Sequence, residues 1–496
     1  MIHPSLTEIK KLILANPETK RIPLYSVLNA DMLTPCMVMR RIMNVDSHCF
    51  LLESAEAEKN AGRYSILGFD PEFLLTVSGG CVKVTQNNEE KQYSGDPSRV
   101  IRQILAENRT AVLPDLPPFT GGLVGYFSYD FIRYSEPRLC LDAEDKENFK
   151  DADLMFFHKI IIFDSFLQKL YLICSMKTDA PDINYLKAEK TLREMKALVT
   201  AGAFARIPPL RLKSPVKALF DEVGYCRMVE EAKNYIHEGD IFQVVLSNRL
   251  EAEMEGSLFD TYRLLRIQNP SPYMFYFSGT DVEIAGASPE TLIKLRNGVL
   301  DTFPLAGTRP RGETEEEDSR LTAELLKDEK ECAEHNMLVD LGRNDLGKIS
   351  VPGSVRVKQY MKTLKFSHVM HIASEVTGRI QNTCDALDAI SAVLPAGTLS
   401  GAPKIRACEI INRLENNKRG IYGGAVGYLD TAGGMDMAIG IRLAYAKNGK
   451  VFVRTGAGIV ADSVAENEYR ECGNKAKAVL EALKMAEGGI DDDTFD

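Results

Sequence analysis

The sequence predicts an α+β protein with large, mainly antiparallel β-sheets packed with helices. Short strand-like segments alternate with turns through roughly the first 175 residues. Two Asn-Gly pairs, at 297–298 and 448–449, stand between alternating apolar and polar segments, a pattern typical of tight hairpins. Amphipathic helical segments lie apart from these hairpins, and this arrangement argues against a doubly wound parallel sheet.

The N-terminal region is predicted to combine hairpins with one long helix. "FLLTVSGGCVKVTQNN" (73–88) predicts a hairpin, and "LMFFHKIIIFDSFLQKLYLICSM" (154–176) predicts two strands joined near Asp164 and Ser165. The segment 183–202 has helical spacing, and the prolines of 203–218 are typical of a linker. We therefore expect an N-terminal region at 1–200, a linker at 201–220 and a C-terminal region at 221–490.

The C-terminal region is predicted to open with an amphipathic helix, "DEVGYCRMVEEAKNYIHEGD" (221–240), which Gly239 ends. A strand at 241–253 and a helix at 258–268 follow, and then come strands at 272–279 and 282–288.

Composition excludes several function classes. The chain of 496 residues has 45% hydrophobic and 26% charged residues and a net charge of −10, which is ordinary for a globular protein. No basic run suggests nucleic-acid binding, and no apolar stretch has membrane-spanning length. The first residues lack a signal-peptide pattern, and the 10 cysteines include no C-x-x-C pair. We expect a cytoplasmic protein with reduced thiols.

One acidic helix carries carboxylates on its apolar face. In "KDEKECAEHNMLVDLGRND" (327–345), Glu331, Glu334, Leu338 and Leu341 fall on one face at spacings of three and four. One interpretation is that the apolar stripe ends here and both glutamates are solvated. The other is that the carboxylates point into a binding site.

A helix near the C-terminus repeats this arrangement. Glu468, Glu471 and Lys475 lie on one stripe of the segment 463–486. A surface ion pair between Glu471 and Lys475 would explain the spacing. Alternatively, Glu471 and Glu334 meet across a cleft and hold Mg²⁺, which takes one or two protein carboxylates.

Nearby segments have features of an anion-binding cleft. In "MDMAIGIRLAY" (435–445), read as one strand, Arg442 lies on a face of small residues. Gly456 and Gly458 weaken the next strand unless a ligand or backbone approaches closely. Bare backbone and one guanidinium can together hold a carboxylate.

The motifs of the C-terminal region resemble those of the chorismate-utilising enzymes, and of their anthranilate synthase component I branch most closely. These motifs occur in the family's order and approximate spacing: "GASPE" (286–290), "PLAGTRPRG" (304–312), "DEKECAEHNMLVDLGRND" (328–345), "VMHIASEVTG" (369–378), "GTLSGAPKIRA" (397–407), "YGGAVGY" (422–428) and "GAGIVADSV" (456–464).

The resemblance implies a set of site residues. It implies Mg²⁺ as cofactor, with Glu334 and Glu471 as its ligands and Glu331 as a plausible neighbour of the metal. Lys475 would lie close to the carboxylates of the substrate. The implied chorismate contacts are Gly307, Thr308, Tyr422, Arg442, Gly456, Ala457, Gly458 and Lys475.

Two positions distinguish reactions within the family. Relatives that make aminodeoxychorismate resemble "PIKGT", in which a nucleophilic lysine stands where this chain has Ala306. Isochorismate and salicylate synthases have a lysine base at the position of Gln243, and a neutral amide cannot activate water. The resemblance therefore implies that ammonia adds directly to chorismate and that pyruvate is then eliminated to give anthranilate.

The same resemblance implies catalytic roles. Glu290 is the candidate acid for the departing hydroxyl, Thr398 would hydrogen-bond near the departing group, and His371 is the candidate for the elimination step. Taken alone, His371 is better explained as a satisfied core histidine. Rival interpretations are an aminodeoxychorismate synthase, which would release no pyruvate, and a non-catalytic sensor of tryptophan or chorismate.

Regulation and partnership are also implied. "LLESAEAEKNAGRYSILGFDP" (51–71) resembles the family's tryptophan-inhibition segment, with Ser54 at the sensitive position and Pro272, Tyr273 and Met274 as the second half of the pocket. By itself, "LLES" can equally end a strand. Because no segment resembles a glutamine amidotransferase, we expect a separate amidotransferase subunit (component II) to deliver ammonia in a hetero-oligomer.

Overall fold

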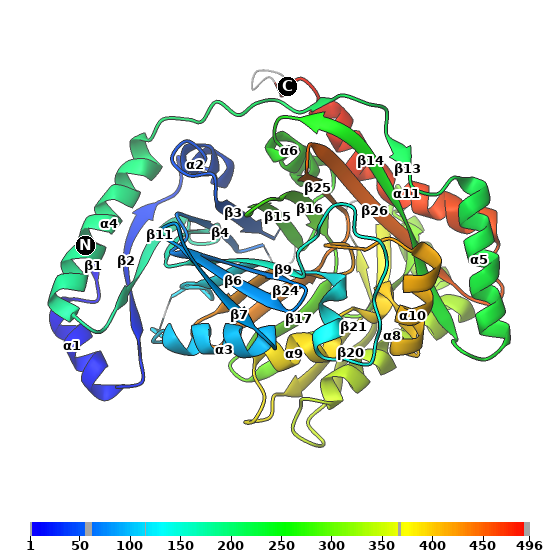
Figure 1. Ribbon diagram of the computed structural model, residues 1–496, viewed down its shortest axis with the longest axis horizontal. Coiled ribbons are helices and arrows are strands. Elements are labelled where there is room, and N and C mark those ends of the chain that lie inside the picture. Colours follow the sequence, from blue (N-terminus) through cyan, green and yellow to red (C-terminus); the bar gives the residue numbers. More distant parts are fainter. Residues whose placement is uncertain (1, 55–61, 115, 366–368, 491–496) are drawn as a thin grey trace.

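Two large antiparallel β-sheets form the centre of the molecule, as the sequence predicts (Figure 1). The computed structural model describes residues 2–54, 62–114, 116–365 and 369–490. Helices α1 and α4 lie at one end of the molecule, and α5 and α11 lie at the other. The helices are α1 (Leu6–Ala15), α2 (Pro35–Ile42), α3 (Pro97–Glu107), α4 (Pro181–Ala201), α5 (Glu222–His237), α6 (Phe259–Gln268), α7 (Glu315–Leu325), α8 (Glu329–Gly347), α9 (Ala386–Val393), α10 (Lys404–Glu415) and α11 (Ala465–Met485), with 3₁₀ helices η1 (Tyr129–Tyr134) and η2 (Gly397–Leu399).

The first sheet begins with strands from the N-terminal region and continues with strands from the C-terminal region. Its order is β1 (Ile2–His3), β2 (Arg21–Asn29), β11 (Lys169–Lys177), β10 (Lys159–Asp164), β4 (Tyr64–Phe69), β3 (Cys49–Glu53), β15 (Tyr273–Ser278), β16 (Glu283–Ser288), β25 (Leu443–Lys447), β26 (Lys450–Ile459), β14 (Gln243–Glu255) and β12 (Arg211–Leu212). The short strands β13 (Lys217–Ala218) and β22 (Gly401–Ala402) also pair with β14.

The second sheet also combines strands from both regions. Its order is β19 (Leu305–Pro310), β21 (Val369–Arg379), β18 (Val299–Thr302), β17 (Thr291–Arg296), β24 (Met435–Ile439), β23 (Ala425–Asp430), β8 (Gly122–Phe127), β9 (Ala152–Phe157), β5 (Phe73–Ser78), β6 (Cys81–Gln86) and β7 (Glu89–Ser94), and β20 (Arg356–Lys365) pairs with β21. The segment predicted as a linker, 203–218, contains β12 and β13 and runs along the edge of the first sheet.

The two sheets pack face to face, and helices cover their outer faces. Along β15, Met274 and Tyr276 join the core under the helices, whereas Phe275 and Phe277 join the core between the sheets. Side chains of a strand alternate between its two faces, so both faces of this strand are covered. Between the sheets, the rings of Phe50 and Phe157 lie 4.8 Å apart, centroid to centroid, in an edge-to-face contact.

The predicted hairpins are confirmed. Asn297 and Gly298 join β17 to β18, and Asn448 and Gly449 join β25 to β26. All four residues have positive φ, between 52° and 75°, which a two-residue turn of this kind requires. The hairpin expected at 73–88 is formed by β5 and β6.

Two strand predictions are wrong in detail. The segment 154–176 forms parts of three strands, because the chain passes from the second sheet to the first between β9 and β10. The segment 435–445 is not one strand: β24 belongs to the second sheet and β25 to the first. Arg442 lies at the crossover with a φ of +53°, a conformation that interrupts a strand.

Candidate active site

Glu290 lies in the short connection between β16 and β17. Its side chain is only 8% exposed, and Thr398 Oγ1 of η2 donates a hydrogen bond of 3.2 Å to Glu290 Oε1. Burial disfavours the carboxylate and raises the pKa of Glu290 to about 8, although the hydrogen bond from Thr398 opposes this shift. The structure thus places the two predicted catalytic groups together and keeps the acid protonated at neutral pH.

His371 lies on β21 opposite the bulged strand β19. Its Nδ1 is 2.8 Å from the carbonyl oxygen of Gly307 and 3.2 Å from Thr308 Oγ1. A carbonyl oxygen only accepts, so Nδ1 of the neutral ring carries the proton and Nε2 is the basic nitrogen. Burial lowers the pKa of His371, and the positive charge of Arg442 lowers it further, against the effect of the Gly307 carbonyl. The ring is therefore a neutral base at physiological pH.

Arg442 projects from the crossover between the two sheets. Its guanidinium donates to the main-chain oxygen of Lys475 on α11. Burial lowers the pKa of Arg442, whereas Tyr422 and Glu471 act in the opposite direction. These mutual effects indicate that Arg442 of the crossover, Glu471 of α11 and Tyr422 of the segment before β23 lie near one another, and that Arg442 lies near His371.

Glycine backbone forms one wall beside these side chains. In the pairing of β14 with β26, Ser247, Leu246 and Val245 lie opposite the triplet Gly456, Ala457 and Gly458. A methyl group on Gly456 would lie 2.7 Å from the hydroxyl of Tyr422, and one on Gly458 would lie 2.6 Å from Gln243 Nε2. At Gly456 the methyl group would also lie 2.7 Å from the main-chain oxygen of Leu246, so that position requires glycine. The amide of Gln243 packs against bare backbone.

Lys475 joins this wall to α11. Its ammonium donates to the Gly456 carbonyl oxygen at 2.9 Å and pairs with Glu471 Oε1 at 2.6 Å. The surface ion pair considered from the sequence therefore exists, and the side chain of Glu471 is 48% exposed. Lys475 also contacts Gly456, one of the predicted chorismate contacts. The lysine can therefore pair with Glu471 and still take part in the site.

The glutamates of α8 lie partly inward. Glu331 and Glu334 are half-buried on the face that also carries the buried Leu338. Burial raises the pKa of Glu331, and the negative charge of Glu334 raises it further. Arg309 Nη1, 3.5 Å from Glu331 Oε1, counteracts these effects. The carboxylates of α8 thus gather where a further cation would be favoured.

The predicted metal ligands lie on two different helices, Glu334 on α8 and Glu471 on α11. Burial raises the pKa of Glu468 on α11, and the charge of Lys330 on α8 partly opposes this effect. Within the described ranges, no group of three or more His, Cys, Asp or Glu side chains could hold a metal ion. Mg²⁺ needs only one or two protein carboxylates when substrate and water complete its shell. The oxygen donors of Glu334 and Glu471 fit that requirement, and their sharing of one ion stays a prediction.

Sequence reasoning missed a buried arginine behind the site. Arg419 is 2% exposed, and it donates to the carbonyl oxygens of Leu399 at 2.6 Å and Val245 at 2.7 Å. Its guanidinium also pairs with Glu415 and lies 5.7 Å from the ring centre of Tyr422. Arg419 directly precedes the "GIYGG" run, but nothing in its spacing distinguishes it from a surface residue.

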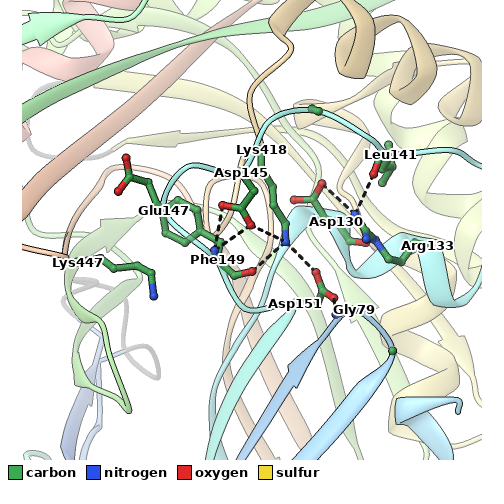
Figure 2. Close-up of polar contacts among 12 residues, drawn as sticks. Gly79, Asp130, Arg133, Leu141, Asp145, Glu147, Phe149, Asp151, Lys418 and Lys447 are labelled. Atoms are coloured by element: carbon green, nitrogen blue, oxygen red, sulfur yellow. Dashed lines mark hydrogen bonds and ion pairs between the residues drawn. The ribbon is translucent and has the colours of Figure 1, made fainter. Parts of the chain in front are cut away.

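A neighbouring lysine anchors the same segment from the other side. Figure 2 shows Lys418 among Asp145, Asp151 and the carbonyl of Phe149, at 3.3, 3.2 and 2.9 Å respectively. Burial acts against the charge of Lys418, but the surrounding carboxylates outweigh it and raise its pKa. Two adjacent cations therefore fix the chain that leads to Tyr422.

The two halves of the predicted tryptophan pocket lie on adjacent strands. Ser54 directly follows β3, and Glu53 pairs with Met274 of β15, so Ser54 lies next to the start of β15, where Tyr273 stands. The Tyr273 hydroxyl bonds to Asp436 Oδ1 at 2.8 Å and Thr291 Oγ1 at 2.9 Å. Residues 55–61 of the predicted inhibition segment lie outside the described residues.

The fold is that of a known class of enzyme. The family model described as chorismate binding enzyme matches residues 47–481. The menaquinone-specific isochorismate synthase of Escherichia coli shares the fold, with a TM-score of 0.68 at 18% identity over 96% of this chain and 99% of that one.

Relatives of higher identity narrow the class. The anthranilate synthase component 1 of Acetivibrio thermocellus is 44% identical over 98% of this chain and 99% of its own length, and that of Aquifex aeolicus is 40% identical over 97% and 98%. The crystal structure of anthranilate synthase component I from Streptococcus pneumoniae matches with a TM-score of 0.75 at 37% identity, covering 91% of this chain and 98% of that one. This chain is therefore an enzyme of the anthranilate synthase component 1 family. In the described part of the chain, no helix is long and apolar enough to cross a membrane.

Proposed function

We propose that this enzyme converts chorismate and ammonia to anthranilate and pyruvate, with Mg²⁺ as cofactor, in the first committed step of tryptophan biosynthesis. The observation that carries the proposal is the matched pair Glu290 and His371, one an acid that holds its proton and the other a base that lacks one. When the environments of two titratable groups shift their pKa values in opposite directions, the group with the raised pKa is assigned as the acid and the group with the lowered pKa as the base.

The first step needs the acid. Ammonia forms a bond to ring carbon two while the bond to the four-position hydroxyl breaks, and the hydroxyl leaves as water with the proton of Glu290. The new ammonium group releases its extra proton to solvent. Thr398, which donates to Glu290, is placed to hydrogen-bond the departing oxygen. In the second step, Nε2 of His371 accepts the proton on carbon two while the bond to the enolpyruvyl oxygen breaks, and the ring becomes aromatic. His371 then gives a proton to the methylene carbon of the enolpyruvate, which leaves as pyruvate.

Substrate carboxylates have complementary partners in the site. Arg442 and Lys475 offer positive charge that meets at the 456–458 backbone and the start of the crossover, and the charge of Arg442 acts on His371. Arginine and backbone N–H groups are the usual partners of buried carboxylates. Ala306 of β19 lies opposite Ile372, next to His371. A nucleophilic lysine is therefore missing at the place where aminodeoxychorismate formation would need it.

Mg²⁺ would be held by Glu334 and Glu471. When bound, it supplies positive charge that neutralises and orients a substrate carboxylate. Removing one of the two carboxylates tests this assignment, with Glu481→Gln as a matched exposed control on α11. We expect Glu334→Gln and Glu471→Gln to weaken Mg²⁺ binding at least about tenfold in titration calorimetry with chorismate present, and Glu481→Gln to leave it unchanged.

Product analysis tests the proposed reaction. The purified chain is incubated with chorismate, Mg²⁺ and ammonium at mildly alkaline pH, and anthranilate fluorescence and pyruvate are measured together. Equal amounts of both products are expected, and EDTA should abolish both. An amine product without pyruvate would indicate aminodeoxychorismate formation instead. No product at all would favour a non-catalytic sensor.

A partner and a regulator complete the proposal. The component 1 names of the relatives support a second subunit, a glutamine amidotransferase, that supplies ammonia from glutamine. The adjacency of Ser54 to the start of β15 supports feedback inhibition by L-tryptophan between the N-terminal and C-terminal regions. We expect Ser54→Arg to relieve inhibition without changing uninhibited activity. Unchanged inhibition in this variant would refute that pocket.

A further inference from the structure

A small cavity lies behind Glu290, within the second half of the chain. Its volume is about 40 Å³, and its lining includes Glu290, Thr302, Gly342, Asp345 and Thr398. His371, Tyr422 and Arg442 do not line it. Helices α8 and α9 with η2 form its far walls, so the cavity extends from the acid away from the proposed substrate contacts.

The cavity is suited to water. It provides carboxyl groups at Glu290 and Asp345 and hydroxyl groups at Thr302 and Thr398. A buried water needs about 10–15 Å³ of such space and two to four polar partners. By that measure, the cavity holds about three water molecules, and both Glu290 and Asp345 line it.

The end of the cavity at Asp345 leads to the surface. Asp345 is buried, and its Oδ2 pairs with Lys404 Nζ at 2.7 Å. Its Oδ1 pairs with Lys348 Nζ at 3.1 Å, and the side chain of Lys348 is 50% exposed. The Lys348 ammonium can therefore give a proton to Asp345, and bulk solvent can then replace that proton at the exposed lysine.

We propose that water in this cavity returns a proton from the Asp345 end to Glu290 after each turnover. This inference depends on the proposed function, in which Glu290 donates its proton to the departing hydroxyl. That step leaves Glu290 as a buried carboxylate facing a site that product still fills. Each water in the chain then accepts one proton and passes another on, so the solvent loses one proton and Glu290 regains one.

Gly342 allows the cavity to be filled without damage to the fold. A methyl group there would lie 3.4 Å from Thr302 Cγ2 and 3.6 Å from Pro304 Cγ, which are ordinary contacts with two residues of the lining. Alanine is also a better helix former than glycine. Gly342→Ala should therefore fold at least as stably as the parent chain while it displaces water. Gly347→Ala, in the same helix with open space around it, is the matched control.

The experiment measures kcat with ammonium in H₂O and D₂O. We expect Gly342→Ala to lower kcat at least about fivefold and to raise the solvent isotope effect on kcat, because proton return becomes rate-limiting. The Michaelis constants for chorismate and ammonium should not rise, and the melting temperature should not fall. Gly347→Ala should match the parent enzyme in all of these.

Other outcomes would overturn the inference. An unchanged kcat and isotope effect in Gly342→Ala would show that protons reach Glu290 by another route. A raised Michaelis constant for ammonium with an unchanged isotope effect would show that the cavity conducts ammonia. Full activity of Glu290→Gln would instead refute the acid role itself, so the failure of the proposed function is distinguishable from failure of the water path.

Discussion

The proposed mechanism depends first on one buried carboxyl group, that of Glu290. Replacing Glu290 with glutamine keeps the size of the side chain and the partner Thr398, but removes the transferable proton. General acids contribute about 10²- to 10⁴-fold to rate, so we expect Glu290→Gln to lower kcat by that order. The kcat of the variant and of the parent enzyme is measured from the anthranilate and pyruvate formed at fixed times. The Michaelis constant for chorismate, measured in the same assays, should change little.

The pH dependence follows from the two shifted pKa values. Glu290 must be protonated to act as an acid, so activity falls as pH rises through its pKa of about 8. His371 must be neutral to act as a base, and its lowered pKa moves the acidic limb below the ordinary histidine range. We expect a plateau of kcat/KM for chorismate between these limits when the concentration of free NH₃ is held constant and saturating. A profile that still rises well above pH 8 would contradict the assignment of Glu290.

At the scale of elements, the hairpins could be predicted because their turns depend on local chemistry. The assignment of strands to sheets could not be predicted because it depends on pairing between distant segments. A two-residue hairpin turn requires positive φ at both residues, and Asn-Gly is the residue pair that adopts it most readily, so the turn can be recognised in the sequence. By contrast, alternation in 435–445 is the same whether its residues join one sheet or two. The left-handed turn at Arg442 is adopted by a residue type that does not favour it, so no local signal marks the crossover.

In the candidate site, too, local spacing could be predicted from the sequence and contacts between distant segments could not. The helical spacing placed Glu331, Glu334 and Leu338 on one face but left open whether the two carboxylates are solvated, and the structure shows that this face is partly buried. Whether Glu334 meets Glu471 of α11 depends on how the sheets position both helices, and no spacing shows it. Arg419 escaped prediction for a related reason, since its partners Leu399 and Val245 come from segments distant in sequence.

Arg419 connects elements that each carry part of the site. Arg419→Lys keeps the charge but cannot bond both carbonyl oxygens and Glu415 together, because it lacks the planar fork. We expect it to lower unfolding free energy by about 2–3 kcal/mol and to lower kcat in addition, as η2 and β14 lose their common anchor. Urea unfolding and steady-state kinetics measure the two effects.

A matched control is available on the preceding helix. Arg413 of α10 is 69% exposed and pairs only loosely with Glu231, at 3.4 Å. Arg413→Lys should therefore leave both stability and kcat unchanged, because exposed ion pairs contribute little. If Arg419→Lys behaved like this control, the anchoring role of Arg419 would be refuted.

At the scale of the whole molecule, the two regions share both sheets. The first sheet passes from β3 to β15 and the second from β23 to β8, so each sheet joins strands from before and after 201–220. Hydrogen bonds across these junctions couple the regions directly. A ligand at the β3–β15 junction therefore acts on one continuous structure and not on a separate regulatory lobe.

Tryptophan should consequently stabilise the entire chain. Ligand at 100 times its dissociation constant adds about 2.7 kcal/mol to unfolding free energy, and for a chain of this size that raises the melting temperature by about 2–3 °C. Scanning calorimetry should show one main transition moving as a whole. In Ser54→Arg the transition should stay in place, because a bulky cation beside the start of β15 fills the pocket. Movement of only part of the transition would mean that tryptophan is bound by one region alone, and an equal shift in Ser54→Arg would place its site elsewhere.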